Sequence, residues 1–217
     1  MLKINEIKTY YINLDKDVAQ RESMEEVLTS SNFTNYERFP AIKAEWGCPK
    51  SHHAILSKDI KPPFIILEDD CQVKNEVLEM EIPDDIDAIY LGISAFGYYN
   101  GNISTVAYNQ VTEDVSRIYN MLSGHAILYL SQRYVDVVKN ISHHCGHLTM
   151  QPFDKSVAEI QKYYNVYALN NPFFYQDTYN KPHTYHDLRS YQTTQDVKKD
   201  PIPKIVRPEI IKFDINE

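Results

Sequence analysis

Several features that would place this chain in a special class are scarce or missing. Six glycines among 217 residues leave no Gly/Ser-rich linker, and no internal repeat or low-complexity block is visible. The three cysteines, Cys48, Cys71 and Cys145, are odd in number and unpatterned, which argues against a disulfide framework and favours a reducing compartment. No apolar run approaches the roughly 18 residues of a membrane span, and the first residues lack a signal-peptide pattern. We therefore expect a soluble, cytoplasmic protein without a transmembrane segment.

Positive charge is also in short supply. The chain has 22 Lys+Arg against 30 Asp+Glu, a formal net charge of -8, and no dense basic run that could neutralise a row of phosphates. This argues against nucleic acid as a partner. The hydrophobic content of 43% and aromatic content of 12% are ordinary for a globular protein. A chain of this length buries roughly 70% of its unfolded surface, so it needs no structural metal or disulfide.

Strand-like and helix-like segments alternate along the chain. The β-branched and aromatic residues at 7–14 predict a strand, and the charged stretch at 15–30 predicts a helix after it. Alternation of this kind predicts an α/β fold with a mostly parallel sheet flanked by helices. After about residue 177 the periodicity fades, so we expect one domain over 1–177 and a C-terminal extension over 178–217 that packs on it or trails from it. Further strands are predicted at 64–67, 88–91 and 126–130, and further helices at 49–56, 131–140 and 153–164.

An acidic triplet, Glu68, Asp69 and Asp70, directly follows the apolar run at 64–67. In open α/β sheets ligands bind outside the carboxyl ends of strands, where this triplet would lie. Three adjacent carboxylates repel one another, and Mg²⁺ or Mn²⁺ is the natural partner for such oxygen ligands. The triplet therefore indicates a metal site, and the alternative is a solvated acidic turn.

The order of several short motifs resembles glycosyltransferase family 25, the lipooligosaccharide and procollagen galactosyltransferase group. The Gly-Cys-x-x-Ser-His element followed by Leu-Glu-Asp-Asp is the specific part of this resemblance, which covers roughly residues 7 to 177. The matching pieces are Tyr11-Ile12-Asn13-Leu14, Arg21, Phe39-Pro40-Ala41, Glu45-Trp46-Gly47-Cys48, Ser51-His52, Ile66-Leu67-Glu68-Asp69-Asp70, Tyr90-Leu91-Gly92, Gly124-His125-Ala126-Ile127-Leu128-Tyr129, Pro152-Phe153-Asp154 and Gln176.

The resemblance implies a GT-A type, Rossmann-like fold that transfers a hexose, galactose or glucose, from a UDP-sugar to a glycan or a hydroxylated protein side chain. It implies that Glu68, Asp69 and Asp70 hold Mn²⁺ or Mg²⁺ and the donor diphosphate, with Asp70 as the direct metal ligand. A cation between carboxylates and diphosphate also explains how an acidic protein can bind an anionic donor.

Further binding residues carry over from the resemblance. Asn13 and Arg21 match positions near the nucleotide, and the pair Ser51 and His52 falls at a motif beside the donor. Spacing alone places His52 on the sheet-facing stripe of its helix, so a core histidine is the alternative.

The resemblance also suggests inversion at the anomeric carbon, which requires a carboxylate base. Asp154 is the candidate for this base, and its alternative role is to stabilise the first turn of a helix.

Departures from the family pattern leave two other functions open. Ala44 stands where the family usually has glycine, and Lys43-Ala44 replaces an expected Asp-Gly pair. A degenerate transferase that binds a nucleotide sugar or glycan without turnover is one alternative. A metal-dependent phosphohydrolase that uses the same triplet with water as acceptor is the other.

Three further groups of residues receive weaker predictions. The histidines of the segment 143–147 resemble zinc ligands, but no second ligand pair is visible, so we predict an exposed polar loop there. A partly ordered tail is the expectation for His183 and His186. The segment 98–102, in a predicted loop, is the candidate for sugar contact.

Overall fold

A computed structural model describes residues 2–74, 79–80, 85–178, 181–182 and 187–190 of the chain. Its α-helices are α1 (Val18–Ser30), α2 (Gly47–Leu56), α3 (Gln132–His143) and α4 (Phe153–Ile160). The described strands are β1 (Leu2–Lys3), β2 (Lys8–Asn13), β3 (Tyr36–Pro40), β4 (Phe64–Glu68), β5 (Cys71–Val73), β6 (Glu79–Met80), β7 (Ala88–Tyr90), β8 (Phe96–Tyr99), β9 (Asn102–Thr105), β10 (Tyr108–Gln110), β11 (Val115–Ile118), β12 (Ala126–Tyr129), β13 (Val166–Leu169), β14 (Phe174–Thr178) and β15 (Lys181–Pro182).

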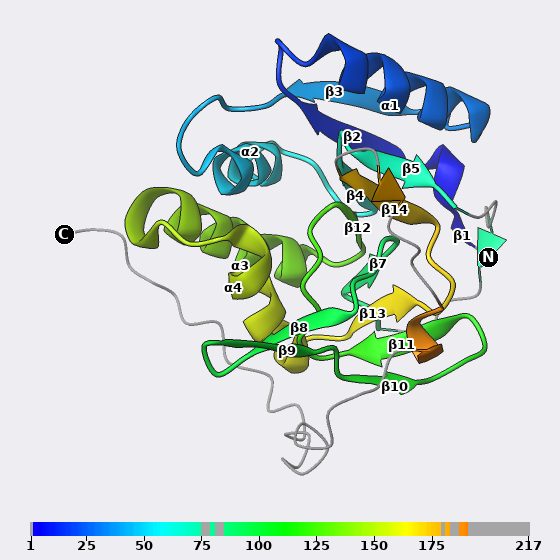
Figure 1. Ribbon diagram of the computed structural model, residues 1–217, viewed down its shortest axis with the longest axis vertical. Helices are drawn as coiled ribbons and strands as arrows, with labels where there is room; N and C mark the ends of the chain where they lie inside the picture. The colour runs from blue at the N-terminus through cyan, green and yellow to red at the C-terminus, as the bar shows by residue number, and fades with distance from the viewer. Residues whose placement is uncertain (1, 75–78, 81–84, 179–180, 183–186, 191–217) are drawn as a thin grey trace.

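An eight-stranded sheet with the order β10-β11-β13-β7-β12-β4-β2-β3 forms the centre of the molecule (Figure 1). The strands β2, β3, β4, β7, β13 and β10 point one way, whereas β12 and β11 point the other way. The α/β class and the mostly common strand direction are therefore confirmed. The strand predicted at 126–130 differs in one respect, because β12 is antiparallel to both of its neighbours, β4 and β7.

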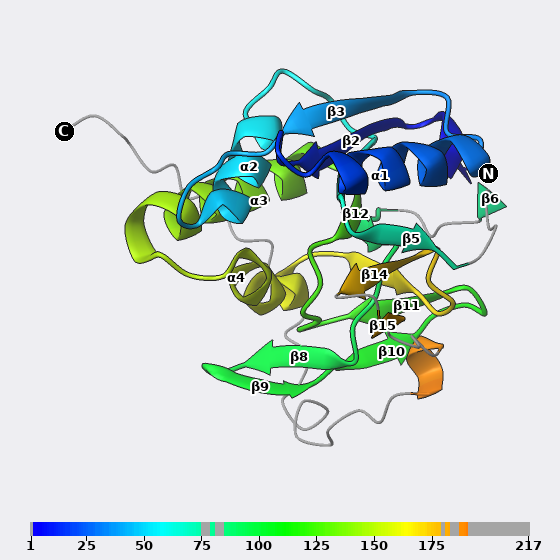
Figure 2. The same ribbon diagram turned by 45° about the horizontal axis from the view of Figure 1, so that its top comes forward.

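Helices cover both faces of this sheet (Figures 1 and 2). On one face α1 buries Met24 and Leu28 against Ile65 of β4. On the other face α2, α3 and α4 pack their apolar stripes against the alternate strand residues, such as Ile66. Alternate side chains of a strand point to opposite faces, which is why the continuous apolar run of β4 supplies both cores. Each large apolar side chain buried in this way contributes about 1.5 to 3 kcal/mol of transfer free energy.

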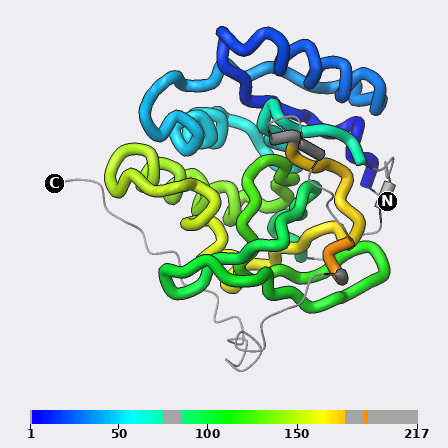
Figure 3. The backbone as a smooth tube through the Cα atoms, viewed as in Figure 1, coloured from blue at the N-terminus to red at the C-terminus, as the bar shows by residue number. Residues whose placement is uncertain are grey.

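The two ends of the sheet are formed by different parts of the chain. Figure 3 shows the N-terminal segment in blue, with β2, β3 and α1, at one end of the sheet, and the green segment with β10 and β11 at the other. Strand β4 lies near the middle, between β12 and β2. The carboxyl end of β4 therefore opens into the space between α2, which follows β3, and the hairpin of β8 and β9.

One buried carboxylate ties together three segments next to β7. Asp87 is fully buried, and its Oδ2 accepts hydrogen bonds from Nη2 of Arg133 and from the backbone N–H of Asn165, both at 2.8 Å. Its Oδ1 accepts from Nε of Arg133 and from the hydroxyl of Ser131. Ser131 also caps α3, since its Oγ accepts from the backbone N–H of Tyr134, as its position before a predicted helix suggested.

Two segments differ from the loops that the sequence predicted. The predicted polar loop at 143–147 is helical instead: α3 runs to its end at His143 and a π-helical turn follows at His144–Thr149, in which Cys145 is buried. Residues 98–102 belong to the β8–β9 hairpin, because Asn100 and Gly101 both have positive φ and form the tight turn for which Asn-Gly is suited.

The described part of the C-terminal extension includes a 3-10 turn at Leu188–Ser190. Leu188 is fully buried in the α2–α4 core, and its backbone N–H donates to the carbonyl of Asn170 at 2.7 Å. The predicted tail histidines His183 and His186 lie outside the described residues. Among the described residues, no helix is both long and apolar enough to cross a membrane.

Candidate functional site

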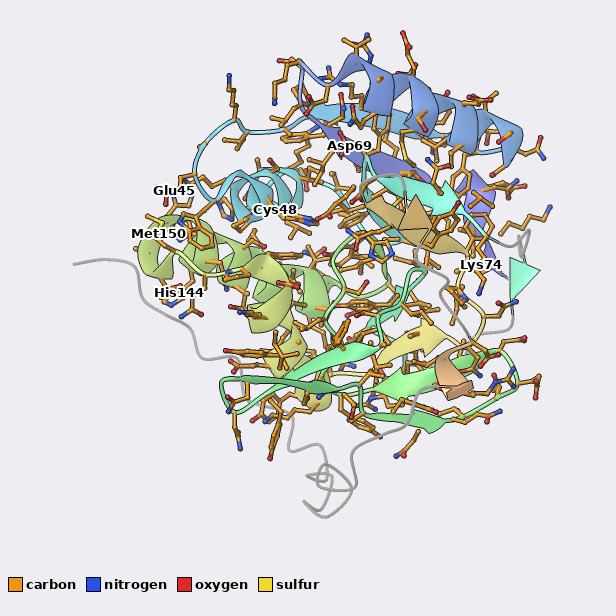
Figure 4. All side chains as sticks on the ribbon, viewed as in Figure 1. Glu45, Cys48, Asp69, Lys74, His144 and Met150 are labelled. Carbon is orange, nitrogen blue, oxygen red and sulfur yellow. The ribbon has the colours of Figure 1, made fainter. Side chains whose placement is uncertain are left out.

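The acidic triplet lies at and just beyond the carboxyl end of β4, and its three carboxylates face three different neighbours. Glu68 ends the strand, and its backbone N–H donates to the carbonyl of His125 at 2.8 Å. Its side chain faces α2, whereas Asp69 faces β2 and Asp70 faces β14. Figure 4 shows Asp69 near β2 and Cys48 on α2. The hydrogen bonds therefore spread the three carboxylates instead of gathering them at one point.

Asp69 is held by the end of β2. Nδ2 of the buried Asn13 donates to Oδ2 of Asp69 at 2.6 Å and to the carbonyl of Asp17 at 3.0 Å. Oδ1 of Asn13 accepts from Nε of Arg38 at 3.0 Å, so the whole carboxamide is engaged within the protein. Burial and the charge of Glu68 raise the pKa of Asp69, although the Asn13 hydrogen bond opposes this shift. Asn13 thus positions Asp69.

Asp70 carries the least satisfied carboxylate of the triplet. Its Oδ2 accepts from Nε2 of Gln176 on β14 at 3.1 Å. Its Oδ1 is buried and has no hydrogen-bond partner among the described residues. Burial, followed by the charges of Glu68 and Asp69, raises the pKa of Asp70 to about 7. A cation at Oδ1 would relieve both the missing contact and the repulsion.

Glu68 faces two side chains of α2 that lie one turn apart. Its Oε1 is 3.4 Å from Nε2 of His52 and 3.5 Å from Sγ of Cys48. Burial acts to raise the pKa of Glu68, but the hydrogen bonds and charges of its neighbours, His52 first among them, together outweigh burial and hold this pKa below its usual value. Desolvation and the charge of Glu68 raise the pKa of the Cys48 thiol, so without a bound cation it stays protonated at neutral pH.

A residue of α4 also holds the His52 ring in place. Its ring is fully buried and stacks on the ring of Phe153, with centroids 4.1 Å apart and an angle of 20° between the planes. Its Nδ1 has no hydrogen-bond partner within the described part of the chain. His52 is therefore both a core residue, as its helical spacing suggested, and a neighbour of the acidic motif.

A pocket of about 970 Å³ opens beside this group. Glu68 and Asp154 both line it, so the strand end and the first turn of α4 face a common space. Oδ1 of Asp154 accepts from the adjacent backbone N–H of Lys155 at 2.9 Å. Burial is the main cause that raises the pKa of Asp154, and the charge of Glu68 adds to it. The remaining lining comes from the start of α2, the segment before β8, the β8–β9 hairpin, the loop before β12, the start of α4 and β14: Trp46, Gly47, Cys48, Pro49, Ser94, Ala95, Phe96, Ile103, Leu122, Ser123, Gly124, Pro152, Phe153 and Gln176.

Close backbone packing forms the α2 side of the pocket. Trp46, the residue before α2, has a left-handed backbone with φ of 60°. A Cβ on Gly47 would lie 2.2 Å from the carbonyl oxygen of Ile42, so glycine is needed where the chain folds back. Ser51 completes this brace: its hydroxyl donates to the carbonyl of Gly47 and accepts from the backbone N–H of Ile42, both at 2.8 Å. Ser51 is fully buried and thus supports the pocket loop instead of facing the pocket.

The other predicted binding residues lie at different distances from the pocket. Arg21 is on α1, and among the described residues its guanidinium makes no hydrogen bond or ion pair. Tyr98 and Tyr99 are on β8 but do not line the pocket, which is lined on this side by Phe96 and Ile103, 61% and 63% exposed. Instead, the ammonium groups of Lys155 and Lys162 lie over the rings of Tyr98 and Tyr99, respectively.

Arg38 was not identified from the sequence as a site residue. It reaches from β3 to Asn13 and pairs with Asp15, which brings a positive charge next to the residue that holds Asp69. The sequence signal for it was weak, because a lone arginine in a short strand is ordinary. Cys48 was not predicted as a site residue, although its spacing of four from His52 places both on one face of a helix.

The acidic triplet does not converge on one point, but Asp70 offers an oxygen of the kind that a hard divalent cation binds. Carboxylate oxygens are the preferred ligands of Mg²⁺ and Mn²⁺, and Oδ1 of Asp70 is a buried oxygen without a partner in the described residues. Within the same residues, the one group of three potential ligands close enough to share an ion is Cys48, His52 and Glu68, whose ligand atoms all lie within 4.8 Å of one another.

Comparisons with known proteins identify distant structural neighbours. No family model matches the chain, and no curated protein matches it significantly. A glycosyltransferase involved in the glycosylation of the major capsid of PBCV-1 has a TM-score of 0.44 and 11% identity, over 71% of this chain and 73% of that chain. A UTP-bound UGPase from Acinetobacter baumannii has a TM-score of 0.37 and 10% identity, over 70% of this chain and 60% of that chain. At these scores neither neighbour establishes a function, and membership of glycosyltransferase family 25 stays a prediction.

Proposed function

We propose that this protein is a metal-dependent glycosyltransferase of GT-A type that moves a hexose from a UDP-sugar to a hydroxyl acceptor. The observation that carries this proposal is the Asp70 carboxylate, which has one buried oxygen lacking a partner among the described residues. Asp70 does not line the pocket of about 970 Å³ itself, but Glu68 of the same motif and Gln176, its hydrogen-bond donor, both do. A site of this volume is within the range of small-molecule and cofactor sites. The acidic motif at a carboxyl strand edge is where open α/β sheets bind their ligands.

In this proposal Asp70 is the direct ligand for Mn²⁺ or Mg²⁺, and Asp69 assists from its position against Asn13. The bound cation would offset the charge of the donor diphosphate and stabilise it as it departs. Gln176 fixes the other oxygen of Asp70 through its hydrogen bond, so the carboxylate is oriented before the donor arrives. Arg38, which donates to Asn13, is a cation on the β2 side of the motif, where we place the nucleotide, and Arg21 on α1 is the second proposed nucleotide contact.

Asp154 is the proposed general base. It lines the pocket together with Glu68, and burial raises its pKa above the usual range of an aspartate, which makes it a better proton acceptor. Its Oδ1 accepts a hydrogen bond from the backbone N–H of the next residue, and its other oxygen is the proposed acceptor of the proton from the acceptor hydroxyl. Base catalysis from a single face of the pocket is consistent with an inverting displacement.

The acceptor would enter over the β8–β9 hairpin. Phe96 and Ile103 expose apolar surface at the pocket, and an aromatic ring offers a platform for the apolar face of a sugar. A glycan or a hydroxylated protein side chain would fit this surface. Galactose and glucose are the proposed donor sugars, on the family resemblance alone.

The test is UDP release from a panel of UDP-sugars, measured with Mn²⁺ and with chelator. Metal-dependent release from one sugar, lost in Asp70→Asn, would support a transferase and identify the donor. Metal-dependent donor binding without release, even with candidate glycan acceptors, would indicate a binding module. Phosphate release from many nucleotides would indicate a phosphohydrolase. No binding of any donor would overturn the proposal.

A further inference from the structure

Three side chains that suit a softer metal ion than Mg²⁺ lie close together beside the pocket. Cys48 and His52 lie one turn apart on α2, and Glu68 reaches them from the end of β4. Neither Cys48 nor His52 has a place in the proposed handling of the donor diphosphate, which uses Asp70 and Asp69. Thiolate, imidazole and carboxylate together are a ligand set that zinc accepts and that Mg²⁺ does not select.

The spacing of these atoms is compatible with three ligands around one ion. Oε1 of Glu68 is 3.4 Å from Nε2 of His52 and 3.5 Å from Sγ of Cys48. An N–H···O hydrogen bond is usually near 2.9 Å, so the His52 contact is long for one. Zinc bond lengths of about 2.3 Å to sulfur and about 2.1 Å to nitrogen or oxygen place tetrahedral ligand atoms roughly 3.4 to 3.6 Å apart. The two measured edges match this range, and the third edge is within 4.8 Å.

The surroundings hold two of the ligands in place and leave room for another. His52 is fully buried with its ring stacked on Phe153, so its Nε2 is fixed toward Glu68. Cys48 and Glu68 line the pocket. A fourth coordination position is therefore accessible from the pocket to water or to a ligand, which is the arrangement of reactive zinc sites and not of closed structural ones.

From this geometry we infer that Cys48, His52 and Glu68 form a three-ligand site for a zinc-class transition metal, separate from the hard-cation position at Asp70. Binding requires the thiolate, so the Sγ proton of Cys48 leaves to solvent when the metal binds. Nδ1 of His52 lacks a partner among the described residues, whereas metal-bound histidines usually donate this N–H. The affinity is accordingly lower, by about 10- to 100-fold, than that of a site with this partner, and the metal exchanges with solution.

Co²⁺ alone is the probe that tests this inference, because a cobalt–thiolate bond gives a charge-transfer band in the near ultraviolet. The full chain is freed of metal by chelator and titrated with Co²⁺, without any nucleotide. We expect the band in the wild type, its loss in Cys48→Ser, and at least about tenfold weaker Co²⁺ binding in Glu68→Gln. Zn²⁺ should remove the band by displacement, and excess Mg²⁺ should not.

Two matched variants make the result specific. Cys145→Ser removes another cysteine, one that is buried in the π-helical turn, and should keep the band. Asp70→Asn removes the hard-cation ligand and should also keep it. A second measurement is alkylation of Cys48, which Zn²⁺ should slow and Mg²⁺ should not.

Absence of the band at saturating Co²⁺ in folded wild-type protein, or its persistence in Cys48→Ser, would overturn the inference. Loss of the band in Asp70→Asn would overturn it as well, because the thiolate site would then depend on Asp70 and would not be separate from the hard-cation position. These outcomes need no UDP-sugar, so they are independent of whether the protein is a transferase.

Discussion

Gln176 forms a hydrogen bond with only one of the two carboxylate oxygens of Asp70. Nε2 of Gln176 donates to one carboxylate oxygen of Asp70 at 3.1 Å, and the other oxygen is buried without a partner in the described residues. Asp87 shows the contrast, since both of its oxygens accept hydrogen bonds from Arg133 and from other groups. Asp87 is therefore fully hydrogen-bonded within the fold, whereas Asp70 has one oxygen that would accept a proposed cation.

Replacing the two carboxylates by amides should have opposite effects on stability. Asp70→Asn removes a charge that repels Glu68 and Asp69, so the metal-free protein should unfold at an equal or higher temperature. Asp87→Asn weakens several charge-assisted hydrogen bonds and should cost about 1.5 to 3 kcal/mol. Thermal and urea unfolding of both variants in chelator checks this. A large loss of stability in Asp70→Asn would mean that the triplet is structural.

Gln176→Ala should weaken donor binding without removing any direct ligand. The amide orients Asp70, and the loss of such a supporting hydrogen bond lowers metal affinity by about 10- to 100-fold. Titration of UDP in the presence of Mn²⁺ measures the change. Gln72→Ala is the matched control, because Gln72 lies on the neighbouring strand β5 and donates to Ser23, away from the triplet. Equal effects of both substitutions would argue against the positioning role.

The Asp154→Asn variant tests whether Asp154 is a general base or only stabilises the first turn of α4. As a base, Asp154 contributes about 10²- to 10⁴-fold to kcat, while donor affinity stays nearly unchanged. The asparagine keeps an acceptor for the N–H of Lys155, so stability should change by less than about 1 kcal/mol. Steady-state kinetics with the donor found in the panel, alongside unfolding curves, gives both numbers. Asp136→Asn on the exposed side of α3 serves as the control. Unchanged kcat in Asp154→Asn would exclude the base assignment.

Buried tyrosines predict a loss of stability at alkaline pH. Burial raises the pKa of Tyr90 to about 12, and raises those of Tyr129 and Tyr134 further. A pKa raised on folding gives stability that is complete below the unfolded value of about 10 and is lost as the pH rises through the folded value. Unfolding free energy should therefore fall steadily above about pH 10, because the buried tyrosines ionise more easily in the unfolded chain. An unfolding free energy that stays constant between about pH 10 and 12 would contradict this.

Tyr129→Phe provides the matched variant for this pH dependence. The Tyr129 hydroxyl is buried without a hydrogen-bond partner among the described residues, so its removal should be neutral or stabilising at neutral pH. The variant should also lose less stability than the wild type between about pH 10 and 12. Destabilisation by more than about 1 kcal/mol at pH 7 would show that the hydroxyl has a partner.

The sequence alone predicts those strands and helices whose apolar residues form a continuous run or recur at a regular spacing. The apolar run of β4, the capping position of Ser131 before α3 and the helical stripe of α4 predicted those elements within a few residues. The antiparallel direction of β12 was not predictable, since a short buried strand has the same composition in either direction. The β8–β9 hairpin was missed although Asn100-Gly101 is a recognisable turn signal.

The candidate site was partly accessible to sequence reasoning. The triplet Glu68, Asp69 and Asp70 stood out because charges directly after an apolar strand are unusual. What each carboxylate faces depends on segments far away in the chain, such as Gln176 on β14 and Asn13 on β2, and one sequence does not give those contacts. Ser51 shows the same limit, because its motif pointed to the donor whereas its hydroxyl braces the Gly47 turn.

Calorimetric titration of UDP into the protein, with Mn²⁺ and with chelator, tests the central claim most directly. The account predicts that wild-type protein binds UDP only with Mn²⁺, and that Asp70→Asn, while folded, loses this metal-dependent binding. Equal UDP affinity in Asp70→Asn and wild type, or UDP binding that is unaffected by chelator, would contradict the assignment of Asp70 as the ligand of a diphosphate-binding cation.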